Sequence, residues 1–171
     1  MPVNKTAMEF VDVQDGQFTV EGCLVTPVAP QLVWEVLTDY EGLARTYSTV
    51  LESHSRLINK QRHVLQKCRW EFLAFSGSFD TQLAVSEEAA AGRLVFRQLQ
   101  SSFMRNFEGR WQVDALPAGG CTARHTLSVT PILSPPAILE GPTRSMFASQ
   151  VERLLADLEA ELARRYPQAG N

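Results

Sequence analysis

The chain has 171 residues, of which 44% are hydrophobic and 20% charged, and its formal net charge is −3. This length and composition predict one globular domain with a sizeable core and argue against a disordered chain. The net negative charge, without any run of lysine or arginine, disfavours binding to nucleic acid. The apolar stretches are far shorter than a membrane span, so no stable membrane insertion is expected.

Three cysteines, Cys23, Cys68 and Cys121, stand far apart, and none forms a C-x-x-C pair. Such a set fits reduced, packed thiols better than a disulfide framework. The first residues include an early glutamate and lack the apolar core of a signal peptide, so we expect a cytoplasmic protein. The three histidines are separated and lack acidic residues at metal-ligand spacing, so neither a metal nor a cofactor is predicted.

The N-terminal third begins with residues 1–13, which we expect to form a flexible arm or a short edge strand. Apolar and polar side chains alternate over residues 17–26, and this pattern predicts a half-buried strand. A short helix is predicted over residues 30–38, because Pro30 suits a first helical position and apolar side chains then return at helical spacing. Residues 43–47 are expected to add another helical turn.

Strand-like sequence fills residues 49–116, and turn residues divide it into shorter strands. Breaks are predicted at four places, namely 59–60, 75–78, 88–92 and 115–120. A last strand follows over residues 122–131. Strands run consecutively before a final helix, which favours an α+β fold with an antiparallel sheet over a nucleotide-binding α/β fold.

The C-terminal segment is predicted to be one helix from Pro136 to about Tyr166. Six apolar side chains recur three or four residues apart and define its buried face: Phe147, Val151, Leu154, Leu155, Leu158 and Leu162. Gln150 is assigned to the opposite, polar face. Glu161 and Arg165 stand in the favourable order for an i,i+4 ion pair.

Pro142 leaves two interpretations of the start of this helix. If the helix begins near Pro136, the proline lies inside it, removes one backbone hydrogen bond and bends it. Alternatively, Pro142 occupies the first turn and the residues before it form a loop. In the first case we hypothesise that the interrupted segment gates the entry of a ligand.

Two stretches, V-W-E-V-L-T-D-Y-E at residues 33–41 and F-E-G-R-W at residues 107–111, together with this order of elements, resemble the START-like (SRPBCC) superfamily. The polyketide cyclase/dehydrase or coenzyme Q-binding-like branch is the most similar. The resemblance extends from Phe18 to Arg165 and includes no catalytic signature. It implies one domain over residues 1–171 with a tail at 167–171.

The resemblance also implies the helix-grip fold, in which a curved antiparallel sheet of about six to seven strands wraps a long C-terminal helix. Two short helices follow the first strand. Sheet and helix leave an apolar cavity between them, and the implied function is the binding or carriage of a lipid, quinone or polyketide-like molecule. Since one fold hosts many functions, a cyclase or dehydratase and a ribosome-association module remain alternatives, although the net charge disfavours the last.

Residues that face this cavity follow from the alternation of side chains along each strand and from the place of the tyrosines after the first helix. The predicted ligand-binding residues are Tyr40, Tyr47, Trp70, Phe72, Phe96, Phe107, Trp111, His125, Phe147 and Val151. A cavity wall of aromatic side chains with a few polar groups is typical of small-molecule sites. The other interpretation is that these side chains form an ordinary core.

His125 is the residue of this set whose side chain has the widest range of possible chemical roles. Inside the cavity it would hydrogen-bond a carbonyl or hydroxyl group, or act as an acid or base in an enzyme. The alternative is a histidine at the edge of the core, bonded to a backbone carbonyl. His54 and His63 are assigned to exposed strand faces. Three arginines, Arg69, Arg97 and Arg105, are candidate polar anchors that are otherwise solvated.

Overall fold

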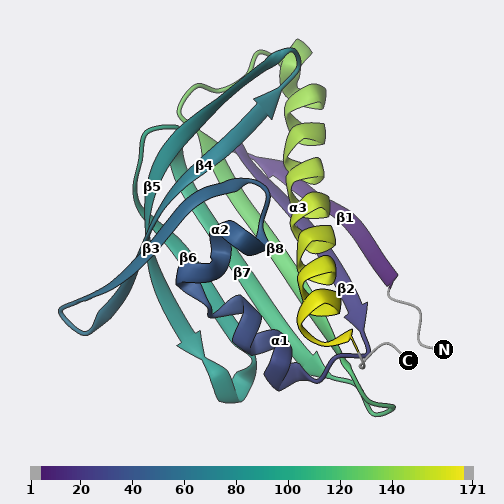
Figure 1. Ribbon diagram of the computed structural model, residues 1–171. Coiled ribbons are helices and arrows are strands. Elements are labelled where there is room, and N and C mark those ends of the chain that lie inside the picture. The colour runs from purple at the N-terminus through teal and green to yellow at the C-terminus, as the bar shows by residue number, and fades with distance from the viewer. Residues whose placement is uncertain (1–4, 168–171) are drawn as a thin grey trace.

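The computed structural model describes residues 5–167. The first four residues of the predicted arm and residues 168–171 of the predicted tail therefore lie outside the described residues. One long helix lies across the concave face of a strongly curved antiparallel sheet (Figure 1). This arrangement confirms the predicted α+β helix-grip architecture.

The sheet has eight strands in the order β1-β2-β8-β7-β6-β5-β4-β3. They are β1 (Lys5–Gln14), β2 (Gln17–Thr26), β3 (Val50–Ile58), β4 (Gln61–Phe72), β5 (Phe75–Glu88), β6 (Arg93–Ser101), β7 (Met104–Ala115) and β8 (Cys121–Pro131). The eighth strand comes from the N-terminal segment, because residues 5–14 pair with β2 along the edge of the sheet. Of the two expectations for this segment, the edge strand is confirmed.

The first helical segment connects two strands that lie far apart in the sheet. Between β2 and β3 the chain forms α1 (Pro30–Leu37), the 3-10 turn η1 (Tyr40–Gly42) and α2 (Leu43–Thr46). A second 3-10 turn, η2 (Ala89–Ala91), joins β5 to β6, and α3 (Ala137–Arg165) follows β8. Pro142 is therefore inside α3, as the first of the two interpretations states.

The predicted turn at residues 75–78 is wrong. The chain turns instead at Leu73 and Ala74, and Leu73 takes a positive φ of 54°. Gly77 pairs with Trp70 inside the β4–β5 ladder. A Cβ on Gly77 would lie 2.9 Å from Nε1 of Trp70, so this glycine makes room for the indole ring and does not mark a turn.

The core lies between the helices and the concave face of the sheet. Alternate residues of β2 are buried, as the sequence pattern predicts. Gly22 allows α3 to approach closely, because a Cβ there would lie 2.6 Å from Cδ1 of Leu155 and 3.0 Å from Cγ1 of Val151. Phe18 of β2 meets Phe147 of α3 with ring centroids 5.2 Å apart. The helix is thereby held against β2, on one side of the curved sheet.

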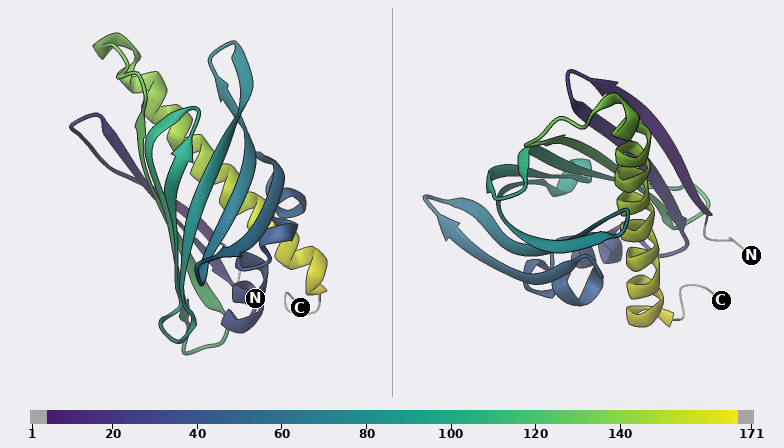
Figure 2. Two further views of the ribbon diagram at one scale, coloured as in Figure 1. Left: turned by 90° about the vertical axis from the view of Figure 1, so that its left-hand side faces the viewer. Right: turned by 90° about the horizontal axis from the view of Figure 1, so that it is seen from above.

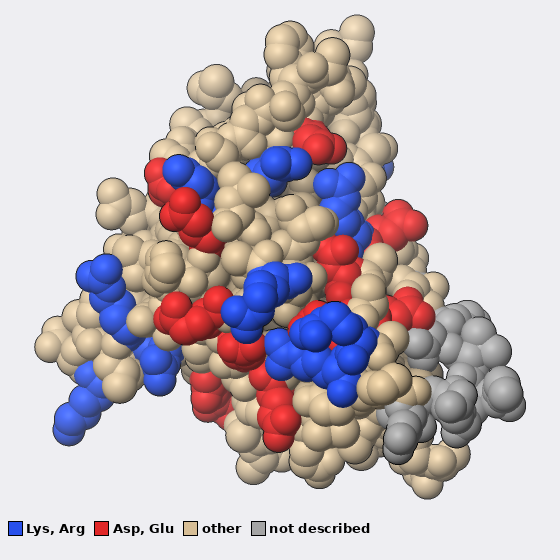
Figure 3. Space-filling view, viewed as in Figure 1, with Lys and Arg blue, Asp and Glu red and all other residues tan. Residues whose placement is uncertain are grey.

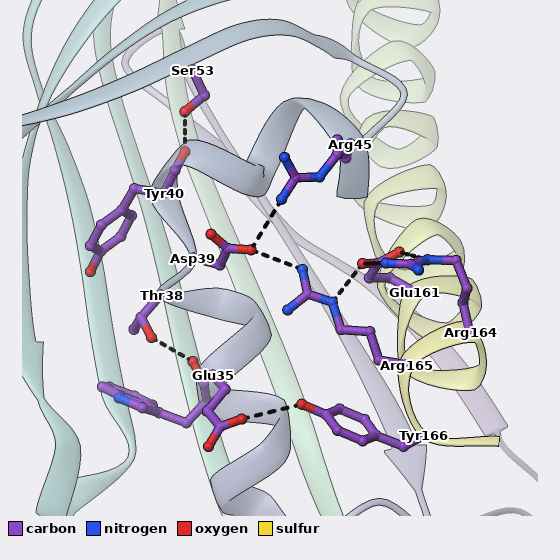
Figure 4. A network of polar contacts seen from close by, with 11 residues as sticks. Glu35, Thr38, Asp39, Tyr40, Arg45, Ser53, Glu161, Arg164, Arg165 and Tyr166 are labelled. Atoms are coloured by element: carbon purple, nitrogen blue, oxygen red, sulfur yellow. Dashed lines mark hydrogen bonds and ion pairs between the residues drawn. The ribbon is translucent and has the colours of Figure 1, made fainter.

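The C-terminal end of α3 is joined to the α1–α2 segment by a polar network (Figure 4). Glu161 accepts hydrogen bonds of 2.6 Å from Arg164 Nη2 and from Arg165 Nε, so the predicted Glu161–Arg165 pair is confirmed. Nη2 of Arg165 also donates to Oδ2 of Asp39 at 2.9 Å. Arg45 reaches the same Asp39 oxygen at 3.7 Å. The two arginines that bond Glu161 lower its pKa to about 2.

Candidate functional site

A cavity of about 160 Å³ lies between the concave face of the sheet and α3. The view from above shows how the curved sheet and the helix surround this space (Figure 2). Strands β3 to β8 and the turn between β6 and β7 supply one wall, and the α1–α2 segment, the residues that follow it and α3 supply the rest. The cavity exists because α3 packs closely on β2 through Gly22 and stands away from the strands beyond it.

One end of the cavity is lined by buried side chains, and we call it the covered end. The buried side chains there include Leu37, Leu43, Phe96 and Trp111. Gly109 of β7 also faces this space, where a Cβ would lie 3.4 Å from Cε1 of His125 and 3.5 Å from Cζ of Phe107. The missing side chain at this position therefore leaves volume that a larger residue would fill.

Half-buried aromatic rings form the other part of the wall. Phe103 stacks between two rings, with centroid distances of 5.4 Å to Trp70 and 5.2 Å to Phe79. Arg69 precedes Trp70 in the chain and is exposed. Of the residues that the structure describes, it is the one lining residue with a charged side chain. The cavity thus passes from a covered end to an aromatic mouth that is partly open to solvent.

Two polar side chains, Tyr47 and His125, face the cavity from buried positions. Only 5% of Tyr47 and 4% of His125 is exposed. Among the described residues, neither the Tyr47 hydroxyl nor Nδ1 of His125 has a hydrogen-bond partner. Burial lowers the pKa of His125 to about 3, so its imidazole is neutral at physiological pH. Burial likewise raises the pKa of Tyr47, so its hydroxyl keeps its proton.

Eight of the ten predicted ligand-binding residues line the cavity. They are Tyr47, Trp70, Phe96, Phe107, Trp111, His125, Phe147 and Val151. Tyr40 lies outside it: its hydroxyl donates to Glu87, its ring meets Phe96 edge-on at 6.1 Å, and its backbone carbonyl accepts from Ser53. Phe72 also lies outside, at the end of β4 next to the turn.

The candidate arginines differ in where they lie. Arg97 pairs with Glu108 on the outer face of the sheet at 3.4 Å, and Arg105 donates to the carbonyl of Ile132 at 3.1 Å. Of the three arginines, Arg69 alone lines the cavity.

The two other histidines lie away from the cavity. His54 is exposed, as predicted, and its Nδ1 lies 3.4 Å from a carboxylate oxygen of Glu41. His63 is half-buried rather than exposed, because its Nδ1 lies 2.9 Å from Nε2 of Gln82 on the neighbouring strand.

Several lining residues were not predicted from the sequence. The main ones are Leu37, Leu43, Gln66, Phe79, Phe103, Met104, Leu127, Met146, Gln150 and Leu154. The assignment of Gln150 to the outer face of the helix is wrong, because α3 rests on β2 and turns one flank, with Gln150 and Leu154, toward the cavity. Alternation along β5 puts Phe79 and Leu83 on one face, and that signal would have found Phe79.

Within residues 5–167, no three His, Cys, Asp or Glu side chains gather in a way that would hold a metal ion. No helix in the described part of the chain is long and apolar enough to cross a membrane. The three cysteines are free thiols, and that of Cys121 is buried.

Comparison with known protein families matches residues 8–125 to the model described as "Domain of unknown function DUF220". No curated protein sequence matches the chain. Among solved structures, the chain is similar to the ZhuI aromatase/cyclase from Streptomyces sp. R1128, with a TM-score of 0.70 and 16% identity over 91% of this chain and 99% of that one.

Two other solved structures show the same fold. A START superfamily protein from Mycobacterium smegmatis has a TM-score of 0.68 and 16% identity, over 86% of this chain and 96% of that chain. The protein TTHA0849 from Thermus thermophilus has a TM-score of 0.70 and 19% identity, over 88% of this chain and 99% of that chain. At these identities the likeness establishes the fold alone, and that fold is START-like, as the sequence resemblance implied.

Proposed function

The chain belongs to the DUF220 family, and we propose that it binds a hydrophobic small molecule in the cavity between its sheet and α3. The observation that carries the proposal is the cavity itself, whose wall is almost wholly apolar and rich in aromatic rings. Walls of this kind, with few polar groups, are typical of sites for small organic ligands.

The size of the cavity limits what it encloses. An engineered apolar cavity of about 150 Å³ takes up benzene, and the cavity here is about 160 Å³. It therefore encloses one or two rings or a short chain. A longer lipid, quinone or polyketide-like molecule would extend through the aromatic mouth, beside the stacked rings of Trp70 and Phe103.

The surface at one end of the molecule favours entry of such a ligand. The upper end of the face in Figure 3, where α3 begins and the β4–β5 hairpin ends, shows no charged side chains. Exposed apolar residues flank this end. Leu73 and Phe75 belong to the hairpin, Leu133 precedes α3 and Ile138 lies in its first turn. Leu133 and Ile138 are each more than 80% exposed. An apolar ligand that enters by this route would displace water from few charged side chains.

The state of His125 favours binding over acid–base catalysis. An imidazole with a pKa lowered to about 3 is a weak base, whereas an efficient general base has a pKa near the working pH. A cyclase that shapes its substrate by confinement would use the same cavity, and it is the second candidate because of the fold shared with an aromatase/cyclase.

The test is titration with N-phenyl-1-naphthylamine, an uncharged dye that fluoresces in apolar sites. We expect saturable binding of one dye per chain. Gly109→Leu fills the covered end and should weaken binding at least tenfold, whereas Gly109→Ala, whose Cβ meets its neighbours at ordinary contact distance, should weaken it less.

Leu57→Ala is the matched control, because it removes an exposed apolar side chain of β3 that does not line the cavity. It should leave dye binding unchanged. Thermal melting of each variant checks that it is folded. Equal dye binding by folded Gly109→Leu and wild type would contradict the proposal.

A further inference from the structure

Four buried side-chain polar atoms have no hydrogen-bond partner among the described residues. They are Oγ1 of Thr46, the hydroxyl of Tyr47, Oε1 of Gln98 and Nδ1 of His125. Of these four residues, Tyr47 and His125 line the cavity. Buried polar groups are nearly always hydrogen-bonded in native proteins, because an unpaired group loses its bonds to water without replacement. Two such groups in one cavity indicate a partner that is not part of the chain.

Both side chains belong to the covered end of the cavity. His125 pairs with Gly22 of β2, and Gly22 lies directly beneath Val151 and Leu155 of α3. Tyr47 precedes Ser48, whose backbone N–H and hydroxyl both donate to Asp157 of α3, at 2.8 and 2.7 Å. The two groups are therefore held under the same stretch of α3, away from its exposed start.

Neighbouring contacts hold the imidazole ring of His125 and the backbone of Tyr47 in place. The imidazole of His125 lies against the indole of Trp111, with ring centroids 4.4 Å apart. The backbone carbonyl of Tyr47 accepts from Val50, and its N–H donates to Leu43. Neither side chain is free to turn into solvent to find a partner, so each needs one inside the cavity.

The charges around the cavity determine the kind of partner. Among the described residues no acidic side chain lines it, and the charged lining residue, Arg69, is exposed at the mouth. At the covered end the imidazole is neutral, so an ionised group there would lose its hydration without meeting an opposite charge. A neutral imidazole and a phenol together offer both a donor and an acceptor, which suits a hydroxyl or carbonyl oxygen.

We propose that the ligand is an uncharged ring compound that places a hydroxyl or carbonyl oxygen at the covered end, where Tyr47 and His125 are its hydrogen-bond partners. The aromatic wall takes the ring, and any longer part of the molecule leaves through the mouth. This inference rests on the proposed function and adds to it the polarity and the orientation of the ligand.

Three ligands of similar shape test the inference by calorimetry or by competition with the dye. In 2-naphthol a hydroxyl replaces the methyl group of 2-methylnaphthalene, and 2-naphthoate carries a charge. A purely apolar site would bind 2-methylnaphthalene best. We expect instead that 2-naphthol binds about threefold to tenfold more tightly than 2-methylnaphthalene, and that 2-naphthoate binds most weakly.

Tyr47→Phe removes only the hydroxyl and should reverse this order, leaving the affinity for 2-methylnaphthalene unchanged or higher. Tyr40→Phe is the matched control, because that hydroxyl donates to Glu87 outside the cavity. At the second position, His125→Leu should reduce the preference for 2-naphthol, and His125→Asn, which keeps a polar group near Nδ1, should restore part of it.

The outcomes separate the inference from the proposed function. If wild-type protein binds both neutral ligands but prefers 2-methylnaphthalene or shows no preference, the inference is overturned and the proposed function stands. Tightest binding of 2-naphthoate would also overturn it and would assign the polar end to Arg69 at the mouth. If none of the three ligands nor the dye binds, the proposed function itself is wrong.

Discussion

Glu161 is a buried carboxylate that is bonded by two arginines. Its side chain is 7% exposed, and two guanidinium groups, those of Arg164 and Arg165, bond its oxygens. Charge-assisted bonds of this geometry stabilise the ionised form. The pKa of Glu161 is therefore lowered from 4.5 to about 2, against the opposing effect of burial.

This shift predicts how stability depends on pH. A carboxyl group whose pKa is lower in the folded state stabilises the fold above its unfolded pKa of about 4.5, and the contribution is lost as the pH falls toward about 2. Glu161→Gln should therefore lower the free energy of unfolding at pH 7, by about 2 kcal/mol once the exposure of Arg164 is allowed for. It should also flatten the pH dependence between 4.5 and 2. Urea unfolding at several pH values measures both effects.

Glu152→Gln on the exposed side of α3 serves as the control and should change neither quantity appreciably. If Glu161→Gln and Glu152→Gln gave the same curves, the network at the end of α3 would contribute nothing measurable to stability.

For single residues, the sequence shows which side chains alternate along a strand. It does not show which group the far end of each aromatic side chain contacts. The alternation along β7 and β8 is enough to place Trp111 and His125 inward. Tyr40 and Tyr47 follow the same helix and look equivalent in the sequence. They differ because the Tyr40 hydroxyl reaches Glu87 on β5, a contact between residues 47 positions apart that no local pattern encodes.

Among the elements, the contact between β2 and α3 depends on one missing side chain. A Cβ on Gly22 would lie within 3.0 Å of side-chain atoms of Met8, Val151 and Leu155. Three neighbours must then move together, and overpacking of this kind costs about 1–3 kcal/mol. Gly22→Ala should therefore lower the melting temperature and loosen α3 from the sheet.

Gly141→Ala is the matched control on α3. Apart from its neighbours in the chain, Glu140 and Pro142, a Cβ there meets nothing within 4 Å, and alanine is favoured over glycine in a helix by up to about 1 kcal/mol. This variant should be more stable than wild type. The prediction fails if thermal unfolding shows Gly22→Ala to be at least as stable as Gly141→Ala.

The elements themselves follow largely from local signals. Helical spacing predicts α3, and turn residues predict the breaks at 59–60, 88–92 and 115–120, where the structure turns. The exception at 75–78 has a tertiary cause, since Gly77 accommodates Trp70 across the ladder. The cavity is not predictable in this way, because its existence depends on how far α3 stands from β4–β8. The sequence pattern indicates which side chains are buried, but it does not indicate how much space is left between them.

In the whole molecule, α3 is held unevenly along its length. Its second half carries the buried residues Leu155, Leu158 and Leu162 and the network around Glu161. Its start is exposed, with 85% of Ile138 accessible to solvent. Pro142 cannot donate a backbone hydrogen bond to Ile138, so the first turns are weakened further. The cavity lies beside this weaker half, because Met146 and Gln150 line it.

This asymmetry predicts that α3 opens at its start while its end stays in place. Amides of residues 144–150 should exchange with solvent faster than those of residues 155–165. Pro142→Ala restores a hydrogen-bond donor and removes the clash of the ring with the preceding turn, so it should slow exchange in the first half of α3. If the start of α3 gates the cavity, the same variant should slow dye uptake severalfold in stopped-flow measurements, with little change in equilibrium affinity.

Gly141→Ala gives a graded comparison, since it strengthens the same turn without restoring a hydrogen bond and should slow uptake less. Unchanged uptake by Pro142→Ala, together with slower amide exchange, would show that the start of α3 moves but does not control entry. The ligand would then have to pass beside the stacked rings of Trp70 and Phe103 without any movement of the helix, and substitutions in that aromatic stack, rather than in α3, would alter the rate.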